Sequence, residues 1–411
     1  MSTFTDLGVP SRLTQILTTS GITEPFPIQE ATIPDLIAGR DVLGRAPTGS
    51  GKTLAFGLPM IIRVDKAAPR RPHALVLTPT RELAEQIARE LAPFARSAGR
   101  SVAAVYGGVG YEPQRNRLRK GVDVLVATPG RLADLIDERT VSLDAVNIVV
   151  VDEADRMADM GFLPQVKRLL DQTHRVRQTS LFSATLDDDV AALTQRYQND
   201  PVKHEVGGTD GHLEAAHYFW RVDQTERIDI TAEIIESANP TLVFTRTRHG
   251  ADRVARQLDR MGLRAAAIHG GRSQSQRTRA LKAFKDGRVD ALIATDVAAR
   301  GIHVEGVASI VHFDLAADYK DYLHRSGRTA RAGAAGVVVS LVLPDQMSDL
   351  RLIQREAGLH DALHDPDNGW LSANGGSRIG ERPLVAAGAT KTVYQSRGRR
   401  SSSGSRGRRR R

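Results

Sequence analysis

Short runs of aliphatic and β-branched residues recur along the first half of the chain, each followed by a longer, more polar stretch with helical periodicity. The runs lie at residues 41–46, 74–79, 123–128, 147–152 and 179–184. Strands that alternate with helices along a chain predict a parallel sheet covered by helices. We therefore expect this half of the chain to form an α/β domain.

The same alternation returns in the second half, with apolar runs at residues 241–246, 263–269, 290–295, 309–314 and 336–343. Between the two halves, residues 203–217 replace this periodicity with Gly, His and charged residues. The chain is therefore predicted to be α/β, with two tandem parallel-sheet domains at 1–206 and 217–360. A flexible linker is expected at 207–216, and a C-terminal extension at 361–411, within which the fold of 361–390 is left open.

The composition is that of an ordinary globular protein. Of the 411 residues, 41% are hydrophobic and 26% are charged, and there is no cysteine. The absence of cysteine excludes disulfides and thiolate metal sites and favours a cytoplasmic protein. No apolar run approaches the length of about 18 residues that a membrane span needs, so we expect no membrane partner.

The net charge of +9 is confined to the C-terminal end of the sequence. Residues 391–411 hold nine basic residues and no acidic one, which leaves equal numbers of each in the rest of the chain. The Ser, Gly and Arg composition of this segment cannot build a core, so we expect a disordered basic tail.

Ligands bind at the carboxyl ends of strands in parallel sheets, so the residues that follow each apolar run are the candidates for chemistry. The sequence GRAPTGSGKT, residues 44–53, follows the first run. Gly49 and Gly51 allow the backbone to wrap around phosphate oxygens at a helix start, Lys52 would reach the β- and γ-phosphates, and Thr53 would hold Mg²⁺. The strict phosphate-loop pattern has Gly where Ala46 stands, and a purely structural turn is the alternative.

A run of four apolar residues at 148–151 leads directly into three carboxylates. Asp152 is expected to direct Mg²⁺ through water, because Mg²⁺ keeps most of its own water ligands. Glu153 can orient and deprotonate an attacking water. Asp155 would then pair with basic or hydroxyl groups elsewhere. The alternative is an acidic, solvated turn, and Lys52 in the same domain argues against it.

DEAD at 152–155 and APTGSGKT at 46–53 resemble the DEAD-box ATP-dependent RNA helicases, including bacterial RhlE-type members. Further motifs of that family follow in order: PFPIQ (25–29), PTRELA (79–84), GG (107–108), TPGR (128–131), SAT (183–185), VFTRT (243–247), QSQR (274–277), ATDVAARG (294–301) and HRSGRTAR (324–331). The resemblance covers about residues 4–358 and implies two RecA-like domains.

The resemblance also implies roles for individual residues, with ATP and Mg²⁺ as cofactors. The catalytic set is Lys52, Asp152, Glu153, Arg328 and Arg331, and Thr53 and Asp152 serve the metal. The nucleotide-binding set is Phe4, Gln29, Ala46, Pro47, Thr48, Gly49, Ser50, Gly51, Lys52, Thr53, Asp152, Asp296, Arg328 and Arg331. The RNA-binding set is Pro79, Thr80, Arg81, Gly108, Thr128, Pro129, Arg131, Thr245, Gln274, Arg277, Thr295 and Gly301. Residues that couple hydrolysis to strand separation are Asp155, Ser183, Thr185 and His324.

Some of these assignments have simpler readings. Arg81 and Arg131 stand at expected helix starts, where an arginine is often only solvated, and His324 could be a polar contact of Asp155 or Thr185. Arg328 and Arg331 are three residues apart, so a helix would present both on one side, as arginine fingers for the γ-phosphate.

Three positions depart from the family pattern. Phe26 stands where most members have Thr, Ile22 replaces the usual aromatic residue, and His303 replaces an Asp. His303 cannot supply the negative charge of that Asp. We therefore expect this replacement to change how tightly ATP binding is coupled to domain closure.

The expected partner is RNA, as single strand or short duplex, held by its backbone without strong sequence preference. Ribosomal or RNA-decay partners and a monomeric core are further expectations. Three other classes share part of these signals: a DNA translocase, a nucleotide kinase and a non-enzymatic RNA-binding scaffold. RNA-stimulated ATP hydrolysis distinguishes the helicase from all three.

Overall fold

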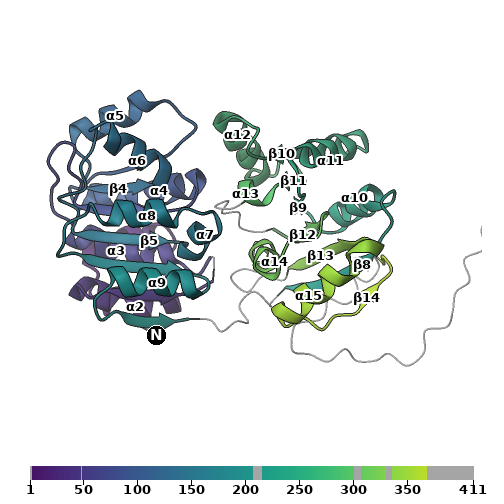
Figure 1. Ribbon diagram of the computed structural model, residues 1–411, viewed down its shortest axis with the longest axis horizontal. Helices are drawn as coiled ribbons and strands as arrows, with labels where there is room; N and C mark the ends of the chain where they lie inside the picture. Colours follow the sequence, from purple (N-terminus) through teal and green to yellow (C-terminus); the bar gives the residue numbers. More distant parts are fainter. Residues whose placement is uncertain (1, 48, 207–214, 300–306, 330–335, 368–411) are drawn as a thin grey trace, which may run out of the picture. The chain divides into compact units, whose positions relative to one another are not determined.

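The computed structural model describes residues 2–47, 49–206, 215–299, 307–329 and 336–367 (Figure 1). These residues form two seven-stranded sheets, with strand orders β3-β4-β2-β5-β6-β1-β7 and β10-β11-β9-β12-β13-β8-β14. All strand pairs within each sheet are parallel. If β8 is counted as the first strand of the second sheet, the two orders are the same. The expected α/β class with two parallel-sheet domains is confirmed.

The first domain contains nine helices and seven strands among the described residues. In chain order they are α1 (Ser11–Thr19), α2 (Pro27–Ala38), β1 (Val42–Arg45), α3 (Lys52–Arg63), β2 (Ala74–Leu77), α4 (Arg81–Ser97), β3 (Val102–Val105), α5 (Tyr111–Lys120), β4 (Val124–Ala127), α6 (Pro129–Asp137), β5 (Ile148–Asp152), α7 (Ala154–Asp159), α8 (Leu163–Leu170), β6 (Gln178–Ser183), α9 (Asp188–Tyr197) and β7 (Val202–Glu205).

The second domain repeats this alternation. Its elements are β8 (Ala216–Arg221), α10 (Arg227–Ser237), β9 (Thr241–Phe244), α11 (Arg248–Arg260), β10 (Ala265–Ile268), α12 (Gln274–Lys285), β11 (Ala291–Ala294), α13 (Asp296–Ala299), β12 (Ser309–His312), α14 (Tyr319–Ser326), β13 (Val337–Val342), the 3₁₀ turn η2 (Pro344–Gln346), α15 (Met347–Ala357) and β14 (Leu363–His364). No helix among the described residues combines the length and apolar character needed to cross a membrane.

Each expected apolar run contains a strand, and four of the described strands were not expected: β3, β7, β8 and β14. Residues 203–217 were predicted to lack regular structure, but β7 occupies one end of this segment and β8 begins at its other end. The last residue assigned to the linker, Ala216, is therefore already the first residue of a strand. In β7 half-buried and exposed residues alternate, which is the pattern of a sheet edge rather than of a buried run.

Both faces of the first sheet are covered by helices, so successive residues of one strand enter different cores. In β2, Ala74 and Val76 belong to a core with helices α1 to α4, and Leu75 and Leu77 to a core with helices α5 to α9. The second sheet divides its residues in the same way between two cores. This burial on both faces explains why β2, β4 and the first four residues of β5 are apolar at every position.

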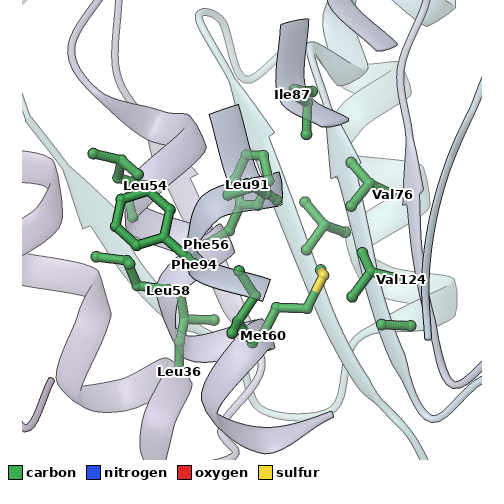
Figure 2. Packing of buried hydrophobic residues seen from close by; sticks show 14 of the residues in the cluster. Leu36, Leu54, Phe56, Leu58, Met60, Val76, Ile87, Leu91, Phe94 and Val124 are labelled. Atoms are coloured by element: carbon green, nitrogen blue, oxygen red, sulfur yellow. The ribbon is translucent and has the colours of Figure 1, made fainter. Parts of the chain in front are cut away.

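Helices α3 and α4 pack closely on one face of the first sheet. Figure 2 shows this contact, with Leu54, Phe56 and Met60 from α3 and Leu91 from α4. The close approach depends on Gly57. A Cβ atom at Gly57 would lie 2.3 Å from Leu91 Cδ2, and Leu91 is fully buried. The two helices can therefore keep this distance only if residue 57 has no side chain.

A double-mutant cycle tests this packing. Gly57→Ala should destabilise the first domain, because overpacking costs about 1–3 kcal/mol and a gain in helix propensity returns only about 1 kcal/mol. Leu91→Ala should cost about 2–5 kcal/mol through the cavity it leaves. In the Leu91→Ala background, Gly57→Ala should become stabilising, because the methyl group then has room. Chemical denaturation measures the four variants, and an equal effect of Gly57→Ala in both backgrounds would show that the two residues do not interact.

Candidate nucleotide and nucleic-acid sites

The strand order places the candidate residues of the first domain along one edge of its sheet. Strands β5, β6 and β1 are neighbours, and they are followed by the acidic residues, by Ser183–Thr185 and by the phosphate loop. Strands β3, β4 and β2 are also neighbours, and they are followed by the candidate RNA-binding segments at 107–108, 128–131 and 79–81. Because parallel strands end at the same edge, the nucleotide set and the RNA set gather on adjoining parts of that edge.

The phosphate loop leads directly into helix α3. Gly51 precedes the helix with a φ of 84°, a left-handed conformation that favours glycine. Lys52, the first helical residue, donates its Nζ to the carbonyl oxygens of Ala46 (2.7 Å) and Pro47 (2.9 Å). The lysine therefore lies folded against its own loop, where phosphate oxygens would compete with these carbonyls. Of the loop residues predicted to bind nucleotide, Thr48 lies outside the described residues.

Gln29 joins the segment before α2 to the phosphate loop. Its Nε2 donates to the Gly51 carbonyl at 2.9 Å, and its Oε1 accepts from the Phe26 backbone N–H at 2.9 Å. A Cβ atom at Gly51 would lie 2.4 Å from Gln29 Nε2. Gln29 is fully buried, and the oxygen and the nitrogen of its side-chain amide each hold one of these two segments.

A cavity of about 590 Å³ opens beside this junction. Its lining brings together seven of the predicted site residues: Gln29, Gly49, Gly51, Lys52, Thr53, Asp152 and Glu153. Phe26 also lines the cavity and is 48% exposed, which makes it an apolar surface available to a ligand. Phe4 was predicted to pack on the adenine base, but the structure places it in the hydrophobic core at 3% exposure, and it is not among the cavity-lining residues.

Asp152 is the last residue of the buried strand β5, and one of its oxygens accepts from the Glu153 backbone N–H at 3.0 Å. Burial raises the pKa of Asp152 to about 7, although the positive charge of Lys52 opposes this. Burial also lowers the pKa of Lys52, against the attraction of Asp152 and Glu153. The charged forms of both groups are therefore costly unless each has a counter-charge.

Glu153 has a left-handed backbone, with φ 52° and ψ 52°, and helix α7 begins at the next residue. A non-glycine residue in this region carries a strain of about 1–3 kcal/mol, which the turn from β5 into α7 imposes. The Glu153 carboxylate lies 3.4 Å from Nη1 of Arg156, which the sequence reasoning did not single out. The signal was available, because residues three apart at a helix start share one side.

The three first-domain residues predicted to couple hydrolysis to strand separation form one hydrogen-bonded group. Asp155 accepts from the backbone N–H groups of Ala184 (3.2 Å) and Thr185 (3.1 Å) and from the Thr185 hydroxyl (3.3 Å). The Asp155 N–H donates to the Ser183 hydroxyl at 3.2 Å. The hydroxyl partner expected for Asp155 is therefore Thr185, and the end of β6 is tied to the start of α7.

The candidate RNA-binding residues of the first domain are oriented by local contacts. Thr80 caps α4 by accepting from the Leu83 N–H at 3.3 Å. Arg131 donates two hydrogen bonds to the Val109 carbonyl, and its guanidinium lies 3.8 Å from the centre of the Tyr111 ring. Arg131 is thus held in place rather than solvated. The N-termini of α4 and α6 both lie at this edge, and such termini favour phosphate groups.

Two further first-domain residues of this set are fixed by the backbone. Pro129 is the first residue of α6, where its missing N–H costs nothing. Gly108 has a φ of 80°, and a Cβ atom there would lie 1.9 Å from Nη1 of Arg81. Arg81 therefore occupies the space that a side chain at position 108 would need.

In the second domain the candidate residues again follow neighbouring strands. Thr245 follows β9, Thr295 and Asp296 follow β11, and Gln274 and Arg277 lie in the first turn of α12, after β10. Gly301, His303 and Arg331 lie outside the described residues.

Asp296 is engaged by an arginine of its own domain. Arg325 donates Nε and Nη2 to the two carboxylate oxygens of Asp296, at 2.5 and 2.8 Å, and Nη1 to the Asp314 carbonyl at 2.7 Å. The prediction that a helix carries both finger arginines is wrong for Arg328, the one of the two that the structure describes. Helix α14 ends at Ser326 and Gly327 follows as its C-cap, so Arg328 lies past the helix end.

Comparison with known proteins agrees with this arrangement. A DEAD/DEAH box helicase model matches residues 26–193, and a helicase conserved C-terminal domain model matches residues 226–333. The chain is 38% identical to the ATP-dependent RNA helicase CshA of Listeria monocytogenes over 357 residues, which is 86% of this chain and 68% of that relative. It is 39% identical to the ATP-dependent RNA helicase DBP2 of Candida albicans over 374 residues, covering 87% of this chain and 66% of that relative.

Among solved structures, S. cerevisiae Dbp5 bound to RNA and ADP BeF3 is similar with a TM-score of 0.80 and 26% identity, over 91% of this chain and 98% of that one. Both halves of the chain thus match the two helicase domains, and the two parallel sheets are RecA-like. The protein belongs to the DEAD-box family of ATP-dependent RNA helicases.

The bridge formed by Gln29 leads to a test. Gln29→Glu keeps an acceptor for the Phe26 N–H but cannot donate to the Gly51 carbonyl, so the affinity for ATP should fall. The loss of one hydrogen bond, about 0.5–1.5 kcal/mol, corresponds to about a threefold to tenfold weaker affinity, measured with a fluorescent ATP analogue. Gln86→Glu adds the same charge to the wall of the same cavity and serves as the control. Equal losses in both variants would assign the effect to charge rather than to the Gln29 bridge.

Proposed function

We propose that the chain couples RNA-stimulated ATP hydrolysis to the local separation of short RNA duplexes and to the remodelling of RNA–protein complexes. The observation that carries this proposal is the cavity in which Gln29, Lys52, Asp152 and Glu153 meet. It combines a buried amide, a phosphate-binding lysine and two acids at the carboxyl edge of a parallel sheet. A nucleotide kinase would leave the candidate residues of the second domain without a use, and a passive RNA-binding scaffold would not need Glu153.

ATP would enter this cavity with its phosphates against the N-terminus of α3. Lys52 would exchange its two loop carbonyls for phosphate oxygens, and the helix dipole would add to its attraction. Gln29 lines the cavity beside Gly51, and the second N–H and second lone pair of its amide would read the adenine edge. Phe26 offers an exposed aromatic surface nearby. This arrangement supports ATP as the substrate.

The residues present fit a Mg²⁺ ion. The Thr53 hydroxyl and the Asp152 carboxylate line the same cavity, and oxygen donors of this kind are those that Mg²⁺ prefers. Thr53 would hold the ion directly and Asp152 through water. When bound, the ion would offset negative charge on the β- and γ-phosphates.

Glu153 is proposed as the general base. Its strained backbone and the contact with Arg156 fix the direction of the carboxylate, so that it can accept a proton from the water that attacks the γ-phosphate. Arg328 and Arg331 of the second domain are proposed to complete the site when ATP and RNA are both bound. The hydrogen bonds among Asp155, Ser183 and Thr185 would connect a change at Asp152 and Glu153 to the end of β6.

RNA is proposed to bind along the strand edges by its phosphates and riboses. Thr80, Thr128 and Arg131 in the first domain and Thr245 and Gln274 in the second offer hydroxyl, amide and guanidinium groups, which suit a backbone rather than base edges. Aromatic residues make up only 5% of the chain, which also argues against recognition by base stacking. We also propose, from the sequence, a cytoplasmic location, a monomeric core and ribosomal or RNA-decay partners.

Measurement of ATP hydrolysis with and without nucleic acid tests the proposal. Single-stranded RNA should stimulate hydrolysis and single-stranded DNA should not, and a short RNA duplex should lose a strand only when ATP is present. Equal stimulation by DNA would favour a translocase, and hydrolysis that ignores both nucleic acids would exclude the proposed function.

Replacement of the proposed base gives a sharper result. Glu153→Gln keeps the shape of the side chain but removes the proton acceptor, so turnover should fall by roughly 10²–10⁴. ATP binding should persist and RNA release should slow. Glu24→Gln removes an exposed carboxylate from the same cavity and should leave turnover unchanged. Near-normal turnover of Glu153→Gln would exclude this residue as the base.

The basic tail at 391–411, which lies outside the described residues, has a separate predicted role. Its eight arginines and one lysine, spaced by Ser and Gly, would attract RNA through many phosphates. Each phosphate neutralised on a single strand contributes about −0.7 to the slope of log affinity against log salt concentration, so deletion of 391–411 should flatten the slope by several units. Maximal turnover at saturating RNA should stay the same. An unchanged slope would reduce the tail to a solubilising segment.

A further inference from the structure

Strand β10 lies at the edge of the second sheet, and among the described residues β11 is its only partner strand. The carbonyls of Arg264 and Ile268, which flank and end this strand, accept from Asp290 (2.8 Å) and Thr295 (3.4 Å) on the β11 side. Successive residues of a strand direct their backbone groups to opposite sides. Ala265 and Ala267 therefore present their N–H and C=O groups to the open edge.

A cavity of about 500 Å³ lies beside this open edge. Helices α11 and α12 flank β10, and they belong to the cores on opposite faces of the sheet (Figure 1). The walls that the helices contribute contain Ala255 on one side and Ala280 and Ala283 on the other. The result is a slot beside β10 whose walls carry small side chains.

The corresponding edge of the first sheet lacks this opening. Strand β3 holds the same place in the strand order as β10, with Val102–Val105 equivalent to Ala265–Ile268. Ala103 and Ala104 are 6% and 8% exposed, whereas Ala265–Ala267 are half-buried. The exposed edge is therefore a property of the second domain and not a consequence of the fold.

The rim of the slot is predominantly basic. Five charged residues line it, three of them arginines: Asp252, Arg256, Asp259, Arg272 and Arg279. Asp252 is already used, because it accepts from Arg272 at 2.6 Å and contacts His269 at 3.0 Å. Arg256 and Arg279 are exposed on opposite walls, and the part of the chain that the structure describes gives neither an ion pair. Because Arg272 is paired with Asp252, the remaining charges of the rim are those of Arg256, Arg279 and Asp259, and their sum is +1. A negatively charged ligand complements this rim.

We propose that this slot binds an extended acidic peptide segment of a partner protein, which adds to β10 as a further strand. The open N–H and C=O groups of Ala265 and Ala267 would pair with the peptide backbone, and Arg256 and Arg279 would contact its carboxylates. The alanine walls restrict the inward-facing side chains of the peptide to small ones. No aromatic residue lines the slot, so it has no surface on which a nucleobase could stack, and a peptide fits it better than RNA.

Selection of peptides on the full chain tests this proposal. A displayed library of random twelve-residue peptides would be enriched on the wild-type chain, and the selected peptides would be synthesised and their affinities measured by fluorescence anisotropy. Ala267→Pro removes an outward N–H and obstructs the edge, and proline is tolerated where the N–H faces away from the sheet. The equivalent Ala104→Pro in β3 is the matched control. A double charge reversal, Arg256→Glu with Arg279→Glu, tests the rim, with Arg12→Glu on the exposed face of α1 as its control.

The selected peptides should be acidic and should bind about tenfold more weakly to Ala267→Pro and to the double reversal, whereas the two controls should leave their affinity unchanged. Thermal melting shows whether Ala267→Pro remains folded, and the double reversal, which changes only exposed side chains, provides an independent readout. Selected peptides without excess acid, or affinities indifferent to both changes, would overturn the proposal. A loss of affinity for single-stranded RNA in the double reversal, with peptide binding intact, would also overturn it and assign the rim to RNA.

Discussion

Burial of both faces of each parallel sheet confines the polar chemistry of these strands to their ends. In β5, four apolar residues are covered by helices before Asp152 and Glu153 appear at the carboxyl end. A charge one residue earlier would enter a core and would need a partner there. The abrupt change from valine to carboxylate therefore marks the place where the strand leaves the two cores. The same constraint places the phosphate loop after β1 and the hydroxyl groups after β6.

Within this edge, two side chains connect segments that the sheet alone would not join. Gln29 ties the entrance of α2 to the phosphate loop, and Asp155 ties the start of α7 to the residues after β6. Both connect through backbone groups, so each fixes the course of the main chain as well as the position of a side chain. Gln29, Asp152 and Glu153 line the cavity, so its walls are held by a small number of hydrogen bonds whose donors and acceptors are already in place.

The sequence predicted the fold class, and it predicted the candidate residues that the structure brings together at one cavity of the first domain, because its signals are local. An apolar run bounded by glycine and charge identifies β1 or β5 without knowledge of neighbours, and the motif spacing then fixes Lys52, Asp152 and Glu153. The edge strands β7 and β14 were not predicted. In β7 every second residue is exposed, and β14 has only two residues. The burial of Phe4, the end of α14 before Arg328 and the contact of Arg325 with Asp296 depend on tertiary packing, and no local pattern contains that information.

Helix α3 joins two requirements that are usually kept apart in a protein. Its first residue is Lys52, and one and a half turns later Gly57 lies against Leu91 in the core. A helix transmits a displacement along its axis with little loss, because its own hydrogen bonds keep its length constant. Mutational drift at the contact between α3 and α4 would therefore alter the position of the lysine ammonium group. A substitution that shifts this contact is therefore expected to change turnover as well as the free energy of unfolding of the first domain.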